Sequence, residues 1–115
     1  MTQTNEITNL ILQDLFRRQI FAWRNSVGTG SGIYTDKDGN TKTRWFQMGK
    51  SGSSDIIAVL PPNGQFLAIE IKTGRDRMRL EQLGFKANLE KMGGIYWVIK
   101  DFEDYQGKIN TLSPQ

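Results

Sequence analysis

The sequence contains no cysteine and no histidine. The absence of cysteine excludes disulfides and thiolate metal sites, and it fits a reducing cytoplasm, where we expect the protein to lie. The absence of histidine excludes Ser-His-Asp and Cys-His catalysis, together with every imidazole-ligated zinc site. A metal ion in this chain would therefore be a hard cation bound by oxygen atoms, such as Mg²⁺, Mn²⁺ or Ca²⁺. General base catalysis would fall to a lysine, a carboxylate or a metal-bound water.

Long apolar runs are also absent. No stretch approaches the roughly 18–20 apolar residues that a membrane-spanning helix requires, and residues 1–6 lack the pattern of a secretory signal. The chain has 115 residues, of which 37% are hydrophobic, and its apolar residues are spread along the sequence. This length and composition predict a single globular domain over residues 1–115, with no membrane association.

Positive charge gathers in two parts of a chain whose net charge is +3. The segment from Lys72 to Arg79 carries four cations against one anion. A second, looser set comprises Lys37, Lys42, Arg44 and Lys50. Clustered cations suit a polyanion such as nucleic acid, although a solvated basic face would have the same composition.

Hydrophobic spacing in the first half of the chain predicts one helix followed by a glycine-rich region. Apolar residues at helical spacing predict a helix over about residues 4–23, capped by Thr4 or Asn5, with Glu6 near the positive end of the helix dipole. Residues 26–54 are rich in glycine and predict loops and turns, with Asp38-Gly39 as a hairpin turn and residues 44–48 as a short strand. We expect such a stretch to be mobile or to become ordered on a ligand.

The second half of the chain has the clearest pattern. Residues 55–60 and 65–72 predict two strands joined by a turn at 61–64, and both are apolar on both faces, so helices should cover both sides of their sheet. A second helix is predicted over 78–92, a strand over 95–99, a helical turn over 101–105 and a short last strand over 109–112. The order α-β-β-β-α-β predicts an α/β fold with a mixed central β-sheet flanked by helices.

A four-residue turn at 61–64 makes residues pair across the hairpin when their numbers add up to 125. Asp55 then lies opposite Glu70, and Lys72 points to the same side. Two carboxylates so close repel each other, and a divalent cation bound by both removes the conflict. A metal-bound water is a nucleophile suited to phosphodiester hydrolysis, and Lys72 can orient it or stabilise charge on the phosphate.

A simpler interpretation of these residues is an exposed ion pair between Glu70 and Lys72, with Asp55 merely beginning its strand. Two features argue against it. The pair lies in an otherwise apolar strand, where isolated charges are costly. Asp55 also falls at the one cross-strand position from which it can share a cation with Glu70.

Asp55 followed by Glu70-Ile71-Lys72 resembles the PD-(D/E)xK nuclease superfamily, and more closely its VRR-Nuc family, which includes small stand-alone phage and bacterial proteins. The resemblance covers most of the chain, and its further matches are Trp23-Arg24-Asn25, Gly49 to Asp55, Thr73, Gln82 and Gly93-Gly94. Ser54 departs from the pattern, since proline or alanine often precedes the aspartate. The resemblance implies a restriction-endonuclease-like core.

The resemblance also implies a role for each matching position. Asp55, Glu70 and the backbone carbonyl of Ile71 would ligate Mg²⁺ or Mn²⁺, and Lys72 would assist the nucleophile. Gln82 would position water or the lysine.

Outside the hairpin, Glu6 matches a family acidic residue that can join the metal shell. Simpler interpretations stand beside these two roles, with Gln82 as a solvated helix residue and Glu6 as a helix-dipole anion. The large aromatic residues are expected in the core; of these, Trp45 and Phe46 lie between basic residues and also suit nucleic-acid contacts. The aromatic residues concerned are Trp23, Trp45, Phe46 and Trp97.

A separate base-reading module does not fit beside a nuclease core in so short a chain. Phosphate contacts that position DNA without reading its sequence would come from Lys50, Arg75, Arg77, Arg79 and Arg44. Stand-alone family members resemble Holliday-junction resolvases, and paired incisions in a four-way junction suit a two-fold dimer.

We therefore expect a homodimeric, metal-dependent endonuclease that cuts branched DNA such as Holliday junctions. The alternatives are a monomeric flap or nicking endonuclease and a non-catalytic DNA-binding domain of the same fold. Phe102 and Tyr105 are candidates for a dimer contact, with core packing as the simpler interpretation.

Overall fold

The structure, a computed structural model, describes residues 3–25 and 28–112, with residues 28–30 and 46–48 described by their backbone alone. Helix α1 (Gln3–Arg17) buries its apolar stripe of Ile7, Ile11 and Leu15. It ends two residues before Gln19, whose φ of 62° is uncommon for a residue other than glycine. The expected helix over 4–23 is therefore too long, because residues 21–24 form a strand. The helical periodicity continued past the true end because Ile20 also packs against the core.

A mixed four-stranded sheet forms the centre of the molecule. Its strands are β1 (Phe21–Arg24), β4 (Ile56–Leu60), β5 (Gln65–Ile71) and β6 (Ile95–Ile99), in the order β1-β4-β5-β6. The β1–β4 and β4–β5 pairs are antiparallel, and β5–β6 is parallel. Ile56 pairs with Ile69, and Leu60 pairs with Gln65. These numbers add up to 125, which confirms the predicted register.

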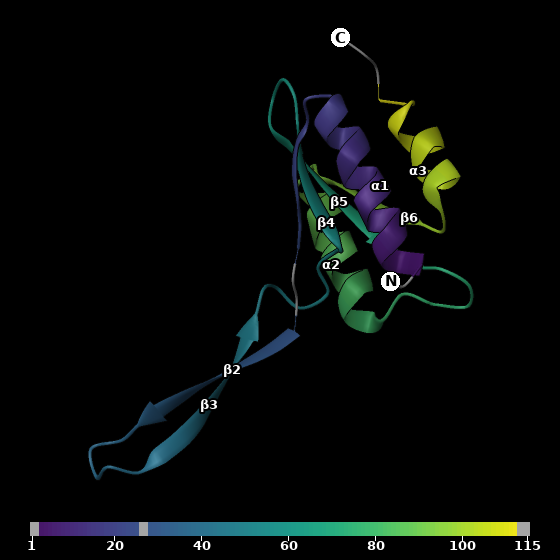
Figure 1. Ribbon diagram of the computed structural model, residues 1–115. Coiled ribbons are helices and arrows are strands. Elements are labelled where there is room, and N and C mark those ends of the chain that lie inside the picture. Colours follow the sequence, from purple (N-terminus) through teal and green to yellow (C-terminus); the bar gives the residue numbers. More distant parts are fainter. Residues whose placement is uncertain (1–2, 26–27, 113–115) are drawn as a thin grey trace.

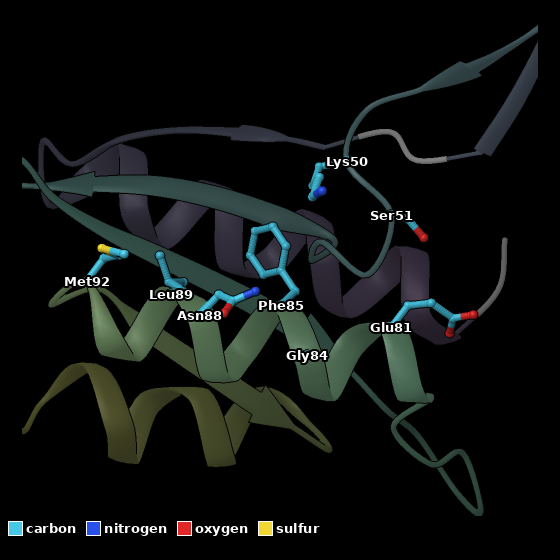
Figure 2. A pocket seen from close by; sticks show the side chains of 8 residues that line it. All are labelled: Lys50, Ser51, Glu81, Gly84, Phe85, Asn88, Leu89 and Met92. Atoms are coloured by element: carbon cyan, nitrogen blue, oxygen red, sulfur yellow. The ribbon is translucent and has the colours of Figure 1, made fainter.

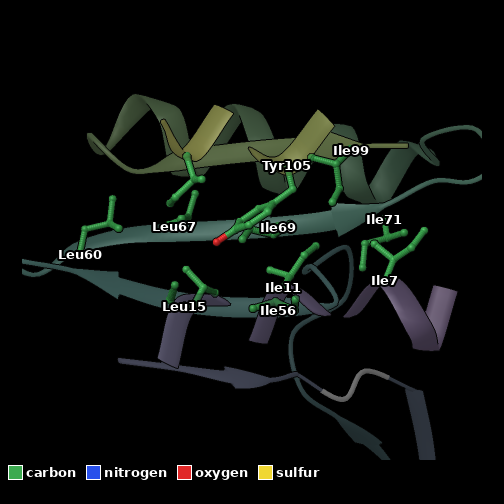
Figure 3. Packing of buried hydrophobic residues seen from close by; sticks show 12 residues of the cluster. Ile7, Ile11, Leu15, Ile56, Leu60, Leu67, Ile69, Ile71, Ile99 and Tyr105 are labelled. Atoms are coloured by element: carbon green, nitrogen blue, oxygen red, sulfur yellow. The ribbon is translucent and has the colours of Figure 1, made fainter. Parts of the chain in front are cut away.

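Helices cover the two faces of this sheet. Helices α1 and α3 (Phe102–Ile109) pack on one face, where Leu67, Ile69 and Ile71 of β5 join the core. Helix α2 (Leu80–Lys91) packs on the other face, where the Phe85 ring contacts Tyr96 of β6. Figure 1 shows α1 and α3 side by side, and Figure 3 shows side chains from α1, the sheet and α3 meeting in one core. The predicted cover on both faces is confirmed for β5, which is buried from Leu67 to Ile71.

Two further strands leave this core as a ribbon. Strand β2 (Gly28–Thr35) pairs antiparallel with β3 (Thr41–Met48) and forms a separate two-stranded sheet. The ribbon projects far from the other elements (Figure 1), so the molecule measures 60 × 32 × 29 Å. The hairpin turn predicted at Asp38-Gly39 is confirmed, and Gly39 has a φ of 85°. The prediction of loops with one short strand is wrong for the described part of residues 28–48, because those glycines lie in a regular ladder.

The core elements α1, β1, β4, β5, α2 and β6 keep the predicted order α-β-β-β-α-β, which makes this a restriction-endonuclease-like α/β core. The first core strand, however, is β1 rather than residues 44–48. The predicted helical turn at 101–105 begins helix α3, whose cap Asp101 accepts a hydrogen bond from the Asp104 amide at 2.8 Å. The predicted last strand over 109–112 is wrong, since Ile109 lies four residues after Tyr105 and both are buried on one side of α3.

The aromatic residues divide between the core and the surface. Trp97 packs against the core, whereas Trp23 is 41% exposed and Trp45 is 70% exposed, so their expected burial is wrong. The Phe46 side chain lies outside the described residues. Tyr105 is fully buried and Phe102 stacks on it, which makes Tyr105 a core residue rather than a dimer contact. In the described ranges, no helix combines the length and hydrophobicity of a membrane span.

Candidate active site

The β4–β5 hairpin brings Asp55 and Glu70 together at its open end. Asp55 directly precedes β4, and Glu70 is the next-to-last residue of β5. The Ile71 amide donates a hydrogen bond to Oδ2 of Asp55 at 2.8 Å, which ties this carboxylate to β5 beside Glu70. The predicted juxtaposition of the two carboxylates is therefore confirmed. The predicted role of the Ile71 carbonyl as a metal ligand stays a prediction.

Glu70 sits in a buried polar cluster on the α2 side of the sheet. Its side chain is 7% exposed, and the Lys72 Nζ lies 3.2 Å from Oε2 with a side chain 15% exposed. Gln82 donates from Nε2 to the same Oε2 at 2.7 Å. An exposed ion pair between Glu70 and Lys72 is therefore ruled out as the description of this strand. Gln82 is 3% exposed, so it is not a solvated helix residue either.

The first turn of α2 fixes the orientation of Gln82. The Arg79 amide donates to Oε1 of Gln82 at 2.9 Å, as part of the cap that begins this helix. The side-chain amide is thus bonded at both ends, and its NH₂ group can only face Glu70. Gln82 therefore links the start of α2 to the carboxylate on β5.

Asn25 fixes the residues that directly precede Asp55. Sequence reasoning named it only as part of a matching segment. Its side chain donates to Oγ of Ser53 and to the carbonyl of Ser54, both at 2.9 Å. Its backbone amide donates to the Asp55 carbonyl at 2.8 Å. Ser54 is buried and donates its hydroxyl to the Ile56 carbonyl at 2.7 Å. The serine that departs from the family pattern is thus satisfied within the chain.

Gly52 lets the same loop touch the start of α2. It has a φ of +83°, and a Cβ added there would lie 2.0 Å from the Glu81 carbonyl oxygen. Only glycine fits a backbone that is both left-handed and this close to another main chain. This contact places the segment before Asp55 against the turn that carries Gln82.

The surroundings of Glu70 change its acidity. Burial, together with repulsion from Asp55, raises the pKa of Glu70 to about 7, against the opposing effects of Lys72 and Gln82. Desolvation and a like charge both disfavour the ionised form of a carboxyl group. Two carboxylates thus share one nearby lysine, and a bound divalent cation would offset the remaining negative charge.

The donor set fits a hard divalent cation. Mg²⁺ is commonly bound by one or two carboxylates, with water and phosphate oxygens completing its shell. Asp55 and Glu70 supply that number. Within residues 3–25 and 28–112, no third acidic residue, histidine or cysteine joins them in a cluster able to hold a metal, and Glu6 is exposed on α1.

The predicted phosphate-binding residues occupy two places. Arg75, Arg77 and Arg79 are exposed on the segment that leads from Lys72 to α2. Lys50 is exposed in the loop before Asp55, so these four residues adjoin the site along the chain. Arg44 is exposed on the ribbon, away from the other four.

An open cavity of about 500 Å³ runs along α2 (Figure 2). Phe85, Leu89 and Met92 form its apolar wall, and Lys50 and Glu81 lie at its other end. The remaining lining residues are Ser51, Gly84 and Asn88. Asp55, Glu70 and Lys72 do not line it, so the cavity and the carboxylate site are separate features.

One residue near the carboxylates was missed by sequence reasoning. Tyr96 is 4% exposed and lies on the same face of the sheet as Glu70, and its hydroxyl has no hydrogen-bond partner within the described structure. Its only signal in the sequence was its alternate position in the strand Ile95–Ile99, which reads as ordinary core.

Comparison with known proteins agrees with this geometry. Residues 3–101 match the model of the VRR-NUC domain. No curated protein and no solved structure was found to match the chain. The VRR-NUC domain is a PD-(D/E)xK-type nuclease domain, and such domains usually use divalent metals. The matched residues include Asp55, Glu70, Lys72 and Gln82. The chain belongs to the VRR-NUC domain family and is a nuclease-type domain that processes DNA.

Proposed function

We propose that this protein is a metal-dependent endonuclease that hydrolyses phosphodiester bonds in branched DNA. The observation that carries the proposal is the buried cluster at Glu70, in which Asp55, Lys72 and Gln82 surround one carboxylate of raised pKa. A binding module gains nothing from two repelling carboxylates beside phosphate. The alternative of a non-catalytic DNA-binding domain is therefore disfavoured.

Mg²⁺ or Mn²⁺ would be held by Asp55, Glu70 and the carbonyl of Ile71. Such an ion, when bound, acidifies a water molecule and offsets charge on the phosphate. Glu6, exposed on α1, is the further acidic residue that we propose would join the metal shell. The tie between Asp55 and the Ile71 amide keeps the first carboxylate in place before any ion arrives.

Lys72 then acts on water and phosphate, while Gln82 acts on the Glu70 carboxylate. Lys72 carries a positive charge next to Glu70 and points into the same cluster, so it can orient the attacking water and stabilise the negative charge that builds up on the phosphate. Gln82 holds the Glu70 carboxylate in one orientation through its bonded amide. Positioning of this kind lowers the reorganisation that the reaction requires.

DNA would be held by exposed cations around the site. Arg75, Arg77, Arg79 and Lys50 adjoin Lys72 and Asp55 along the chain and suit phosphate contacts, which position a duplex without reading its sequence. Arg44 would add a contact from the ribbon. Its neighbour Lys42 is already paired with Asp36 at 3.1 Å.

The proposed substrate is a Holliday junction cut by a homodimer in the cytoplasm. Two active sites related by a two-fold axis would make the paired incisions that a four-way junction requires. The competing proposal is a monomeric enzyme that cuts flaps or nicks DNA. Both proposals use the same chemistry and differ in mass and substrate.

The first experiment compares labelled four-way junction, flap and linear duplex DNA with Mg²⁺ or Mn²⁺, using wild-type protein and Lys72→Ala. Paired symmetric cuts in the junction by wild type, absent in Lys72→Ala, are the expected result. The variant should still bind DNA, and loss of binding as well would count against a catalytic role for Lys72. Cuts in flaps alone would replace the substrate and keep the chemistry. Light scattering separates the dimer from the monomer.

A further inference from the structure

Tyr96 and Glu70 lie on the α2 face of the sheet, on the neighbouring strands β6 and β5. Its partner on β5 is Ala68, and Glu70 pairs with Val98, so Tyr96 and Glu70 project to the same side in adjacent rows. Above them, α2 presents Gln82 to Glu70 and Phe85 to Tyr96, whose ring lies 6.0 Å from that of Phe85. The same helix and the same two strands therefore position both side chains.

The hydroxyl of Tyr96 is the feature that packing does not explain. The side chain is 4% exposed, and this hydroxyl is the buried side-chain polar group in the described residues for which no hydrogen-bond partner is found. A buried donor without a partner costs free energy, so native proteins rarely keep one without a purpose. A phenylalanine would fill the same space against Phe85 without that cost.

The charge around this hydroxyl shows what it can do. Burial raises the pKa of Tyr96, and the negative charges of Glu70 and Asp55 raise it further. The phenol therefore keeps its proton at any ordinary pH and acts as a donor. Both carboxylates act on it electrostatically, which places it beside the site, but it bonds to neither.

We propose that the Tyr96 hydroxyl is a hydrogen-bond donor of the active site, reserved for an oxygen atom that enters with the metal or with DNA. This inference rests on the proposed nuclease function. The shared chemistry of its partner is an acceptor oxygen, supplied either by a water between the carboxylates or by a phosphate oxygen. Tyr96 would thereby position that oxygen next to Glu70 and Lys72.

The test is Tyr96→Phe, which removes the hydroxyl and keeps the ring. The unfolding free energy without metal, from urea titration, should be unchanged or higher, because an unmet donor is lost. The turnover rate on cleavable DNA should fall about tenfold or more, the effect of one lost hydrogen bond in a transition state. Tyr105→Phe is the matched control, because its buried hydroxyl is bonded to Asp14 at 2.6 Å. That variant should lose stability and keep the turnover rate.

Mn²⁺ titration calorimetry without DNA separates the two sources of oxygen. Weaker Mn²⁺ binding by Tyr96→Phe identifies a water near the metal, whereas equal Mn²⁺ binding with slower turnover identifies a phosphate oxygen. Equal turnover and equal Mn²⁺ binding would overturn the proposal, and a loss of stability alone would assign the hydroxyl to folding. Equal turnover in Tyr96→Phe with inactive Lys72→Ala would defeat this inference and leave the nuclease function standing. Wild-type protein that cuts no DNA would defeat the function, and the Mn²⁺ titration would then decide the role of Tyr96.

Discussion

Two carboxylate–lysine pairs, one in the core hairpin and one in the ribbon, have nearly the same length and opposite acid–base behaviour. Glu70 and Lys72 lie 3.2 Å apart, and Asp36 and Lys42 lie 3.1 Å apart. Burial raises the pKa of Glu70 to about 7, whereas the backbone amide of Asn40, with Lys42, lowers the pKa of Asp36. Contact distance alone therefore does not decide what a charged pair can do.

The difference lies in what covers each hairpin. Strand β5 is buried from Leu67 to Ile71, with helices on both faces. The ribbon side chains from residue 31 to residue 45 are exposed except for Asp36, which is partly buried. Water around the ribbon stabilises each charge by itself. In the core, where water is excluded, the stability of each charge depends on the charges next to it. The surroundings of a hairpin therefore decide the acidity of its carboxyl groups.

The largest expected effect separates the two lysines. Lys72→Gln should lower the DNA cleavage rate by about 100-fold or more, because the site loses its cation and its acid–base group. Lys42→Gln should leave the rate unchanged, since its pair with Asp36 lies on the ribbon. Single-turnover cleavage at saturating DNA measures both. Equal losses in the two variants would mean that the ribbon takes part in the chemistry.

A second comparison uses two glycines with nearly equal backbone angles. Gly52 has a φ of +83° and faces the Glu81 carbonyl, whereas Gly39 has a φ of +85° and has nothing within 4 Å of an added Cβ. Gly39→Ala should cost about 1–2 kcal/mol, from backbone strain alone. Gly52→Ala should cost about 1–3 kcal/mol more, because the loop must also move away from α2. Urea unfolding measures the difference, and equal costs would show that the contact of Gly52 with α2 is unimportant.

Tyr105→Phe tests the polar link inside the core. The Tyr105 hydroxyl bonds to Asp14 at 2.6 Å, and its loss should cost about 1–3 kcal/mol at neutral pH. Burial raises the pKa of Asp14, but hydrogen bonds from Tyr105 and Arg18 outweigh it and lower the pKa below 3.8. The stabilisation is therefore present above about pH 3.8 and lost as the pH falls through the lower, folded-state value.

Urea unfolding of wild type and Tyr105→Phe at pH 7, 5 and 3 checks this behaviour. The difference in unfolding free energy should be constant at the two higher values and smaller at the lowest. A difference that grows as the pH falls would contradict the assignment to ionised Asp14.

Shortening the ribbon should have the smallest effect on stability. Ser31 pairs with Trp45, so an Asn-Gly turn can replace residues 32–44 without moving the paired ends. The unfolding free energy should stay within about 0.5 kcal/mol of wild type, since the ribbon adds little to the core. DNA affinity should fall because Arg44 is removed, and fluorescence anisotropy at two salt concentrations would detect this. A large loss of stability would show that the ribbon supports the core.

The sequence predicted the β4–β5 hairpin well because that region combines two independent signals. The turn at 61–64 sets the pairing of the two strands, and charged residues in an otherwise apolar strand mark candidate site residues. Together they predicted the register and the meeting of Asp55 with Glu70. The burial of Gln82 and the hydrogen bonds of Asn25 depend on where α2 and β1 pack. The spacing of residues along the sequence does not contain that information.

The ribbon was not predicted because it buries almost nothing. Strand patterns are recognised by the alternation that burial imposes, and an exposed ladder needs none. Glycine in β2 reads as a loop, although Gly30 and Gly32 pair in regular register with β3. The end of α1 was misplaced for the opposite reason. Ile20 packs against the core although the helix has already ended, so its apolar character continues the helical spacing.

The ribbon also has a consequence for how this nuclease can diversify. Its two strands leave and rejoin the body at neighbouring points, because Gly28 pairs with Met48. Chain added or removed beyond that pair costs little in loop-closure entropy and does not strain the carboxylate site. Evolution or a protein engineer can therefore exchange the ribbon for a different element and leave the carboxylate site unchanged.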